Sequence, residues 1–370
     1  MSVQTNALNH YVTLGRSGLR VSPICLGTMT FGLEWGFGCP EEISVSMISR
    51  FRELGGNFFD AANIYTNGHN ETILGDYFAS GPGRGQRDSA VIATKFGGNM
   101  WPKDPNGGGS GRKSMFTAVE HSLRRLKTDY IDLLWCHFED AHTPIQEMVA
   151  SMDLLVKQGK VRYLGLSDHP AWVCTQAQYE AAAHSMTPFI ALQVEYSLLQ
   201  RTVENELMPM ARALGMGVTP WSPLRGGVLS GKFTRQHHPA DDGSTRVKSD
   251  SKFLNEHTFV LLDALAEIAA AHSVTSAQVA LRWVMDRDGV GSTIIGARSL
   301  AQLDDNLAAC AVQLSPSETK HLDALTTPAH AFPHEFLANL VPIISQGGTT
   351  INGRSAAPWP LSPQSDADRW

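Results

Sequence analysis

The chain has 370 residues, of which 42% are hydrophobic and 18% charged, and its formal net charge is −6. This composition is typical of a globular protein; it excludes the basic surface that nucleic-acid binding needs, and no apolar run is long enough to cross a membrane. The polar start MSVQTN lacks the apolar core of a signal peptide, and five scattered cysteines form no C-x-x-C pair. We therefore expect a cytoplasmic protein without a disulfide or zinc framework.

The elements predicted in chain order begin with a hairpin over residues 11–22, which would close the bottom of a barrel. Eight short apolar runs are predicted to be strands, at 24–28, 57–59, 90–94, 130–136, 161–166, 190–194, 217–219 and 292–295. Helical periodicity is found at 41–54, 71–78, 115–126, 145–158, 172–184, 204–214, 258–272, 276–286 and 300–310. Strands that alternate with amphipathic helices indicate a parallel sheet. A doubly wound sheet would need G-x-G-x-x-G after its first strand, and the sequence contains no such pattern.

Three of these strands end in ionisable residues. Asp60, Lys95 and His137 stand at the ends of successive runs, and Tyr65 follows Asp60 in a polar loop. Each has an ordinary explanation when taken alone: a turn cap, a surface lysine, a core histidine or an unremarkable tyrosine. Together they indicate the active face of a (β/α)8 barrel, where catalytic groups come from the C-terminal ends of several strands.

The ordered set Asp60, Tyr65, Lys95 and His137 resembles the tetrad of the aldo-keto reductase superfamily, and the likeness runs from about Tyr11 to about Leu325. The aryl-alcohol-dehydrogenase-like branch is the most similar. The resemblance implies an α/β fold, a (β/α)8 TIM barrel over 1–325 with an N-terminal hairpin, followed by a C-terminal extension over 326–370. It also implies reversible reduction of carbonyls with NADPH.

The tetrad suits that chemistry because a carbonyl needs a hydride on carbon and a proton on oxygen. Tyr65 would be the general acid, and the charge of Lys95 is expected to lower its pKa from about 10. Asp60 would hold Lys95 charged, and His137 would orient the carbonyl through a hydrogen bond.

Several later motifs match the family's cofactor contacts. Residues 226–232 fit G-x-x-x-x-G-K, but Phe233 stands where a phosphate-binding loop needs Ser or Thr, so we expect a loop over the cofactor pyrophosphate and not a nucleotide hydrolase. Asp168 stands where Asn is usual, and it can accept from the nicotinamide carboxamide but cannot donate to it. Arg298, at a helix start, suits a 2′-phosphate and favours NADP over NAD. The contacts implied by the resemblance are Gly27, Thr28, Asp60, Ser167, Asp168, Gln193, Trp221, Ser222, Pro223, Leu224, Gly227, Leu229, Lys232, Gly296, Arg298, Gln302, Asp305 and Asn306.

The substrate site is predicted from aromatic residues on the loops. Trp35, Phe37, Trp101 and Phe138, together with Tyr65 and His137, favour aromatic or bulky ring-bearing carbonyls. The resemblance also implies that the C-terminal extension walls this pocket. No metal is expected, because the histidines near residue 137 match no zinc spacing.

One alternative function comes from a different class of protein. Channel-associated β-subunits resemble this fold and bind the cofactor mainly as sensors with slow turnover. The small-molecule substrate, the direction of the reaction in the cell and any homo-oligomer stay open at this stage.

Overall fold

The computed structural model describes residues 8–239, 246–248 and 250–369. Its centre is one sheet of eight parallel strands in the order β10-β3-β4-β5-β6-β7-β8-β9. The strands are β3 (Ile24–Gly27), β4 (Phe58–Asp60), β5 (Val91–Phe96), β6 (Ile131–Cys136), β7 (Val161–Ser167), β8 (Phe189–Glu195), β9 (Gly217–Trp221) and β10 (Thr293–Ile295). They are almost wholly buried, as expected of parallel strands covered on both faces.

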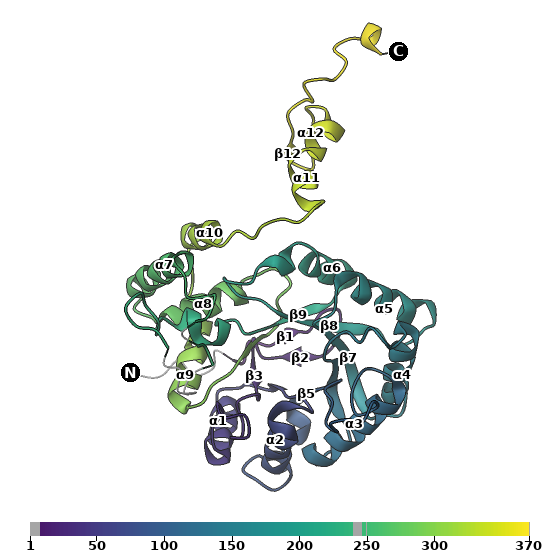
Figure 1. The fold of residues 1–370 in the computed structure, drawn as a ribbon, viewed down its shortest axis with the longest axis vertical. Helices are drawn as coiled ribbons and strands as arrows, with labels where there is room; N and C mark the ends of the chain where they lie inside the picture. The colour runs from purple at the N-terminus through teal and green to yellow at the C-terminus, as the bar shows by residue number, and fades with distance from the viewer. Residues whose placement is uncertain (1–7, 240–245, 249, 370) are drawn as a thin grey trace. The chain divides into compact units, whose positions relative to one another are not determined.

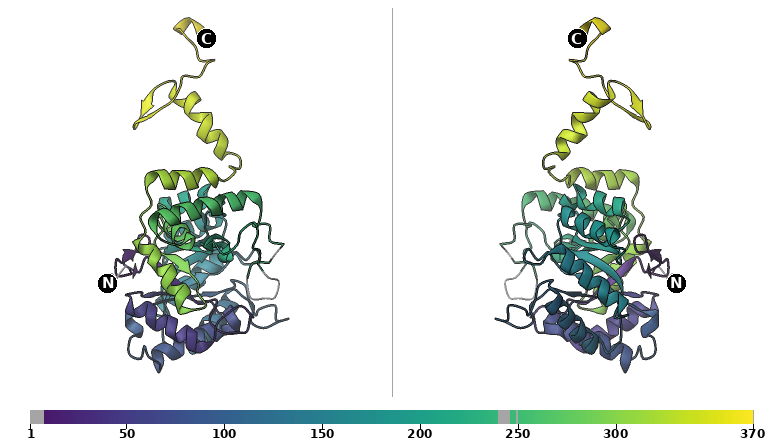
Figure 2. Two further views of the ribbon diagram at one scale, coloured as in Figure 1. Left: turned by 90° about the vertical axis from the view of Figure 1, so that its left-hand side faces the viewer. Right: turned by 90° about the vertical axis from the view of Figure 1, so that its right-hand side faces the viewer.

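The sheet closes on itself where its first and last strands meet. The backbone N–H of Val218 in β9 donates to the carbonyl of Gly289 at 2.9 Å, and the N–H of Gly291, just before β10, donates to the carbonyl of Val218 at 2.8 Å. The predicted (β/α)8 barrel is therefore confirmed. Figure 1 shows the ring of strands with the helices outside it, and Figure 2 shows the same layers from two sides.

Helices follow the strands and cover the outside of the ring. In α3, for example, Met115, Val119 and Leu126 are buried along one face, in the 3–4-residue spacing that an amphipathic helix requires. The helices of the barrel are α1 (Glu41–Glu53), α2 (His69–Ala79), α3 (Arg112–Leu126), α4 (Ile145–Lys157), α5 (Ala171–Ala183), α6 (Leu207–Leu214), α7 (Glu256–His272), α8 (Ser276–Met285), α9 (Leu300–Ala308) and α10 (Pro316–Leu325).

A short hairpin precedes the barrel, as predicted. Its strands β1 (Val12–Thr13) and β2 (Arg20–Val21) pair antiparallel, and in Figure 1 they lie across the centre of the ring. Leu14 and Val21 are fully buried and belong to the same apolar cluster as Trp135 of the barrel interior. The backbone at Gly15 comes so close to β8 that a Cβ there would lie 2.2 Å from the carbonyl oxygen of Ile190. The hairpin thus seals one end of the barrel.

Some boundaries differ from the sequence prediction. The helix predicted from residue 204 begins at Leu207, because Thr202–Glu204 forms a separate 3₁₀ turn. Helix α10 was not predicted, although its start carries a capping box in which Ser315 and Glu318 satisfy each other's backbone N–H groups. Strand β9 continues two residues past the predicted end, to Trp221.

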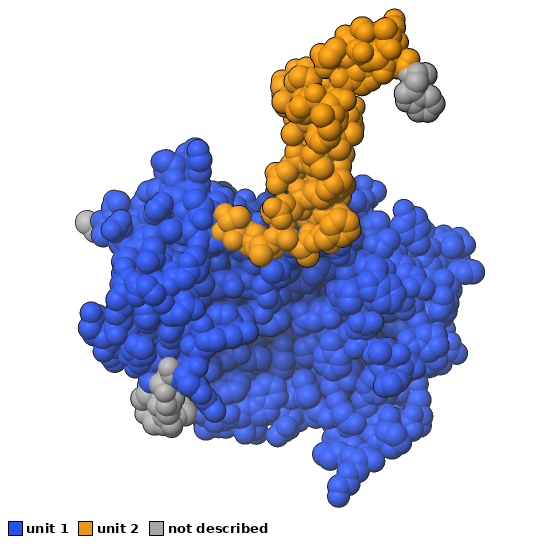
Figure 3. Space-filling model, turned by 45° about the horizontal axis from the view of Figure 1, so that its top comes forward, with its two compact units in different colours: residues 1–326 blue, residues 327–370 orange. Residues whose placement is uncertain are grey.

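The chain divides into two compact units, residues 1–326 and 327–370, which Figure 3 colours separately. The described part of the second unit contains two short α-helices, two paired strands and a 3₁₀ turn: α11 (His334–Asn339), α12 (Val341–Gln346), β11 (Thr350–Ile351), β12 (Arg354–Ser355) and η6 (Asp366–Asp368). The expected role of this segment as a wall of the substrate pocket stays a prediction. Of the helices in the described residues, none alone is long and apolar enough to span a membrane; α7 and α8 together meet that test but are bent by 96°.

Candidate active site

A buried ion pair lies at the ends of β4 and β5. Lys95 is 1% exposed and Asp60 2%. The Lys95 ammonium donates to Asp60 Oδ2 and, at 2.9 Å, to the carbonyl of Ala61, while Gln193 Nε2 donates to Asp60 Oδ1 at 2.9 Å. A buried charge is costly unless it is paired and hydrogen-bonded, and both charges meet that condition here.

Tyr65 takes the third hydrogen bond of the ammonium. Lys95 Nζ donates to the Tyr65 hydroxyl at 3.1 Å and lies 4.7 Å from the ring centroid. Tyr65 begins a short 3₁₀ turn, η1 (Tyr65–Gly68), that is kinked at Thr66 and Asn67, where φ is 45° and 58°. The turn is fixed from α2, because Asn70 Nδ2 donates to the carbonyl of Tyr65 at 2.7 Å.

His137 also packs against the Tyr65 ring. Its ring centroid lies 5.9 Å from that of Tyr65, edge to face, and Phe138 stacks on the imidazole at 5.2 Å. The ring centroid of Trp35 lies 5.9 Å from that of Tyr65, and the Phe37 ring packs on Trp35 at 6.0 Å. The four predicted residues Asp60, Tyr65, Lys95 and His137 therefore meet in one cluster.

The electrostatics of this cluster follow from its burial. Burial raises the pKa of Tyr65 above its ordinary value, and the opposing charge of Lys95 does not outweigh it, so the expected lowering is absent from the protein alone. Burial acts to lower the pKa of Lys95, but the charges of Asp60 and Tyr65 prevail and raise it. Burial and the charge of Lys95 lower the pKa of His137 to about 3, so this imidazole is neutral near pH 7. The cluster can present a protonated phenol and a neutral imidazole to a ligand.

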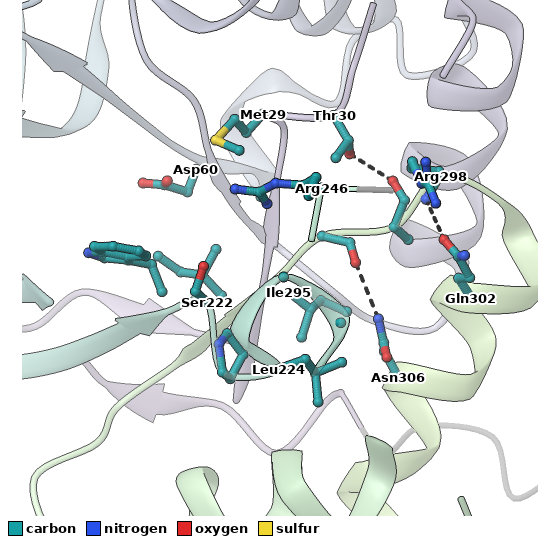
Figure 4. A pocket seen from close by; sticks show the side chains of 18 of the residues that line it. Met29, Thr30, Asp60, Ser222, Leu224, Arg246, Ile295, Arg298, Gln302 and Asn306 are labelled. Carbon is teal, nitrogen blue, oxygen red and sulfur yellow. Dashed lines mark hydrogen bonds between the residues drawn. The ribbon is translucent and has the colours of Figure 1, made fainter. Parts of the chain in front are cut away.

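A cavity of about 510 Å³ extends from this cluster to the start of α9. In Figure 4, Asp60 and Ser222 lie at one side, and Arg298, Gln302 and Asn306 at the other. Of the predicted residues, those that line it are Gly27, Asp60, Tyr65, His137, Asp168, Gln193, Trp221, Ser222, Pro223, Leu224, Gly227, Lys232, Gly296, Arg298, Gln302, Asp305 and Asn306. Sequence reasoning missed Met29, Thr30, Gly226, Ser230, Arg246, Ala277, Ile294, Ile295 and Ala297.

The remaining predicted residues do not line this cavity. Thr28 is buried and donates to Asn70 Oδ1 at 2.9 Å, and Leu229 packs in the core. Trp101 lies against His121, with ring centroids 5.1 Å apart. Trp35, Phe37, Phe138 and Ser167 likewise do not line it. Ser167 Oγ is buried beside Asp168 without a hydrogen-bond partner of good geometry.

The loop after β9 forms a tight glycine turn, η4 (Arg225–Ser230). Gly226 and Gly227 have φ of 65° and 99°, backbone angles that residues with a side chain rarely adopt. A Cβ on Gly227 would lie 2.8 Å from Lys232 Nζ, so the ammonium sits directly over the turn. An ion pair between Arg225 and Glu195 holds the turn to the end of β8.

The far end of the cavity is built by α9. Ser299 caps the helix, and the backbone N–H of Arg298 donates to Gln302 Oε1 at 2.9 Å. Burial lowers the pKa of Lys232, and the charge of Arg298 lowers it further, which places two cations within electrostatic reach of each other. The start of a helix beside two cations fits phosphate groups, and a glycine turn admits a ligand close to its backbone. The residues therefore fit a dinucleotide phosphate.

Asp168 and Trp221 are neighbours in the lining of the cavity. The indole N–H of Trp221 donates to Asp168 Oδ1 at 3.0 Å. Asp168 keeps access to solvent, yet the protein atoms around its carboxyl raise its pKa to about 6. Among the described residues, no group of three His, Cys, Asp or Glu side chains could hold a metal ion.

Comparison with known proteins agrees with this geometry. The sequence pattern of the Aldo/keto reductase family matches residues 23–327. The chain belongs to the aldo/keto reductase family. It is 33% identical to aryl-alcohol dehydrogenase GME11368 of Pestalotiopsis microspora over 89% of this chain and 85% of the relative. It is 35% identical to norsolorinic acid reductase B of Aspergillus parasiticus over 91% of this chain and 90% of the relative.

This aldo/keto reductase is an oxidoreductase that acts on carbonyl and alcohol groups of small molecules. Its named relatives are dehydrogenases and reductases, so the alternative of a channel-associated cofactor sensor is not favoured. The predicted family and fold are thereby confirmed.

Proposed function

We propose that this protein reduces aromatic or bulky ring-bearing aldehydes and ketones with NADPH, and catalyses the reverse oxidation of the alcohols. The observation that carries this proposal is the Tyr65 hydroxyl, held 3.1 Å from the buried Lys95 ammonium at the edge of a cavity that suits a dinucleotide. The bound cofactor supplies the hydride, and the protein supplies the proton, the orientation and the exclusion of water.

Each member of the cluster has a distinct part in this proposal. Tyr65 donates its hydroxyl proton to the carbonyl oxygen, and the adjacent Lys95 ammonium stabilises the phenolate that remains. Asp60 keeps Lys95 charged and fixes its direction. His137 is neutral, so it offers one N–H that can hydrogen-bond the same oxygen as negative charge develops there.

The preference for ring-bearing substrates is supported by the rings around the phenol. Trp35 packs on Tyr65, Phe37 packs on Trp35, and Phe138 stacks on His137. Rings favour offset or edge-to-face contacts with other rings, which aliphatic chains do not provide. The similarity to an aryl-alcohol dehydrogenase adds support.

A panel of carbonyls measured with NADPH and NADH tests the proposal. We expect sustained turnover and a higher kcat/KM for benzaldehydes and fused-ring ketones than for short aliphatic aldehydes. Equal efficiency on both substrate classes would contradict the ring preference. A single turnover followed by arrest would contradict the enzyme and support a cofactor sensor.

The choice of NADPH depends on Arg298 in this proposal. Replacing Arg298 with alanine should raise the Kd for NADPH roughly tenfold or more, because a charge-assisted bond to phosphate contributes about 1.5–3 kcal/mol. The Kd for NADH, which lacks the 2′-phosphate, should change little. Fluorescence titration of both cofactors checks this, and an equal loss of affinity for both would mean that Arg298 does not read the 2′-phosphate.

Asp168 should make cofactor binding depend on pH. Its pKa of about 6 means that the carboxyl is neutral below that pH and anionic above it. Because an anion beside the nicotinamide stabilises the oxidised, cationic ring, the Kd for NADP⁺ relative to NADPH should fall as the pH rises from about 5 to 7. In Asp168→Asn this dependence should disappear; an unchanged pH profile in the variant would show that another group is responsible.

A further inference from the structure

A second cavity, of about 240 Å³, lies between the loop after β6 and the start of α5. Glu139 and Asp140 line it from the loop, and His169 and Trp172 line it from the segment that begins α5. None of the described residues lines both this second cavity and the cavity beside Tyr65. The second cavity is therefore separate from the site of the proposed reaction, which gives its side chains no role.

His169 brings a buried hydrogen-bond acceptor to the second cavity. It is 4% exposed, and its Nδ1 lies 2.5 Å from the carbonyl oxygen of Ser167, which can only accept, so Nδ1 carries a proton. Burial lowers the pKa of His169, so the imidazole is neutral near pH 7 and Nε2 is an acceptor. Within residues 8–239, 246–248 and 250–369, no group donates to Nε2. A buried acceptor without a donor is costly, and a donor on a ligand would remove that cost.

Glu139 adds a carboxylate that has no counter-ion. Neither an ion pair nor a hydrogen bond joins its side chain to another of the residues that the structure describes. Burial raises the pKa of the Cys174 thiol in α5, and the charge of Glu139 adds to that effect. The negative charge of Glu139 therefore acts on the side of the second cavity that α5 provides.

Asp140 is the second carboxylate of the lining. Burial acts to raise its pKa, but hydrogen bonds from Thr143 Oγ1 at 2.7 Å and from the backbone N–H groups of Ser110 and His142 prevail and lower it, so the group is ionised near pH 7. The described residues of the lining include no lysine or arginine. The starts of α4 and α5 oppose the two carboxylates, but each helix start contributes only about half a positive charge. The second cavity therefore keeps a net negative charge.

The rest of the lining indicates an organic cation and not a metal ion. In the part of the chain that the structure describes, no group of three His, Cys, Asp or Glu side chains could hold a metal ion. Met148 and Val173 supply buried apolar surface, and the Trp172 side chain, in a residue that is 63% exposed, adds an accessible ring. Such a ring attracts a cation and also packs on an apolar or aromatic chain.

We propose that the second cavity binds a small organic ammonium ion, a primary amine that carries an apolar or aromatic tail. Its N–H groups donate to His169 Nε2 and to the Glu139 carboxylate, and its tail packs on the apolar surface of the lining. The same two loops supply His137 and Asp168 to the cavity beside Tyr65, so the amine binds next to the active site without entering it.

Calorimetric titration with 2-phenylethylamine, which is protonated at neutral pH, tests this site. The neutral N-acetyl derivative and the anion 3-phenylpropanoate are the comparison ligands, because both keep the ring and the chain. The ammonium ion should bind roughly tenfold or more tightly than either, as a charge-assisted hydrogen bond provides. Its Kd should be the same with and without saturating NADPH, since the second cavity is separate from the cavity beside Tyr65.

Three variants locate the binding. Glu139→Gln should raise the Kd for the ammonium ion roughly tenfold, and Trp172→Ala should raise it by about two- to fivefold. Both residues are exposed, so neither change should disturb the fold. Glu180→Gln removes a carboxylate of α5 that does not line the second cavity, and the Kd should stay the same. An unchanged Kd in Glu139→Gln overturns the inference, and so does displacement of the amine by NADPH or equally tight binding of the neutral or anionic ligand.

Discussion

Replacing Tyr65 with phenylalanine is expected to lower kcat for carbonyl reduction by roughly 10²–10⁴-fold, the range that a positioned general acid contributes. The Lys95 ammonium donates a hydrogen bond to the phenol oxygen at 3.1 Å. Phenylalanine keeps the ring but has no hydroxyl proton to donate to the substrate. The Kd for NADPH should stay close to that of the wild type, because the cofactor contacts proposed above come from other residues.

The structure supplies a matched control for this substitution. Tyr11 is exposed, its hydroxyl donates to the carbonyl of Gly55 at 2.8 Å, and neither residue lines the cavity. Tyr11→Phe should therefore retain wild-type kinetics. Stopped-flow and steady-state assays with NADPH and an aromatic aldehyde check both variants. If Tyr65→Phe kept more than about a tenth of the wild-type kcat, a different group would have to be the acid, since the expected loss is at least about 10²-fold.

The meeting of the catalytic side chains at the strand ends was predictable, because the barrel topology brings the ends of all its strands to one face. In a parallel barrel every strand points the same way, so Asp60, Lys95 and His137 at three strand ends had to come to one face. The hydrophobic runs located those strands to within a few residues, as the observed β4, β5 and β6 show. The meeting of these side chains therefore needed only the fold, which alternating strands and helices indicated.

Other features depend on packing that a sequence does not display. The expected lowering of the Tyr65 pKa considered only the charge of Lys95. In the folded protein the phenol is also buried, and its loss of water raises the pKa by more than the charge of Lys95 lowers it. Trp101 was predicted near the substrate from its loop alone, and that role stays a prediction; its packing on His121 could not be read from the sequence. Arg246 stands in a polar stretch without periodicity, so no pattern could have linked it to the cavity.

Removing the carboxylate of Asp60 is expected to destabilise the fold as well as stop catalysis. Asp60→Asn leaves the Lys95 ammonium buried with only neutral partners, the Ala61 carbonyl and the Tyr65 hydroxyl. Breaking a buried ion pair from one side costs about 3–5 kcal/mol, because the remaining charge has lost its water without compensation. Urea unfolding should show this as a lower midpoint, and kcat should fall because Lys95 is no longer held in place.

A double-mutant cycle distinguishes the stability of the pair from its role in the reaction. Lys95→Met alone leaves the buried Asp60 carboxylate with Gln193 as its side-chain hydrogen-bond donor. Combining Asp60→Asn with Lys95→Met removes both charges and should restore most of the free energy of unfolding. The double variant should still be inactive, since the proposed acid has lost its cation. The exposed pair Arg50 and Asp304, 2.8 Å apart, is the control, and Arg50→Met should cost less than about 1 kcal/mol. A double variant as unstable as the sum of its singles would mean that Asp60 and Lys95 are not energetically coupled, and a double variant with wild-type kcat would mean that the reaction does not need the pair.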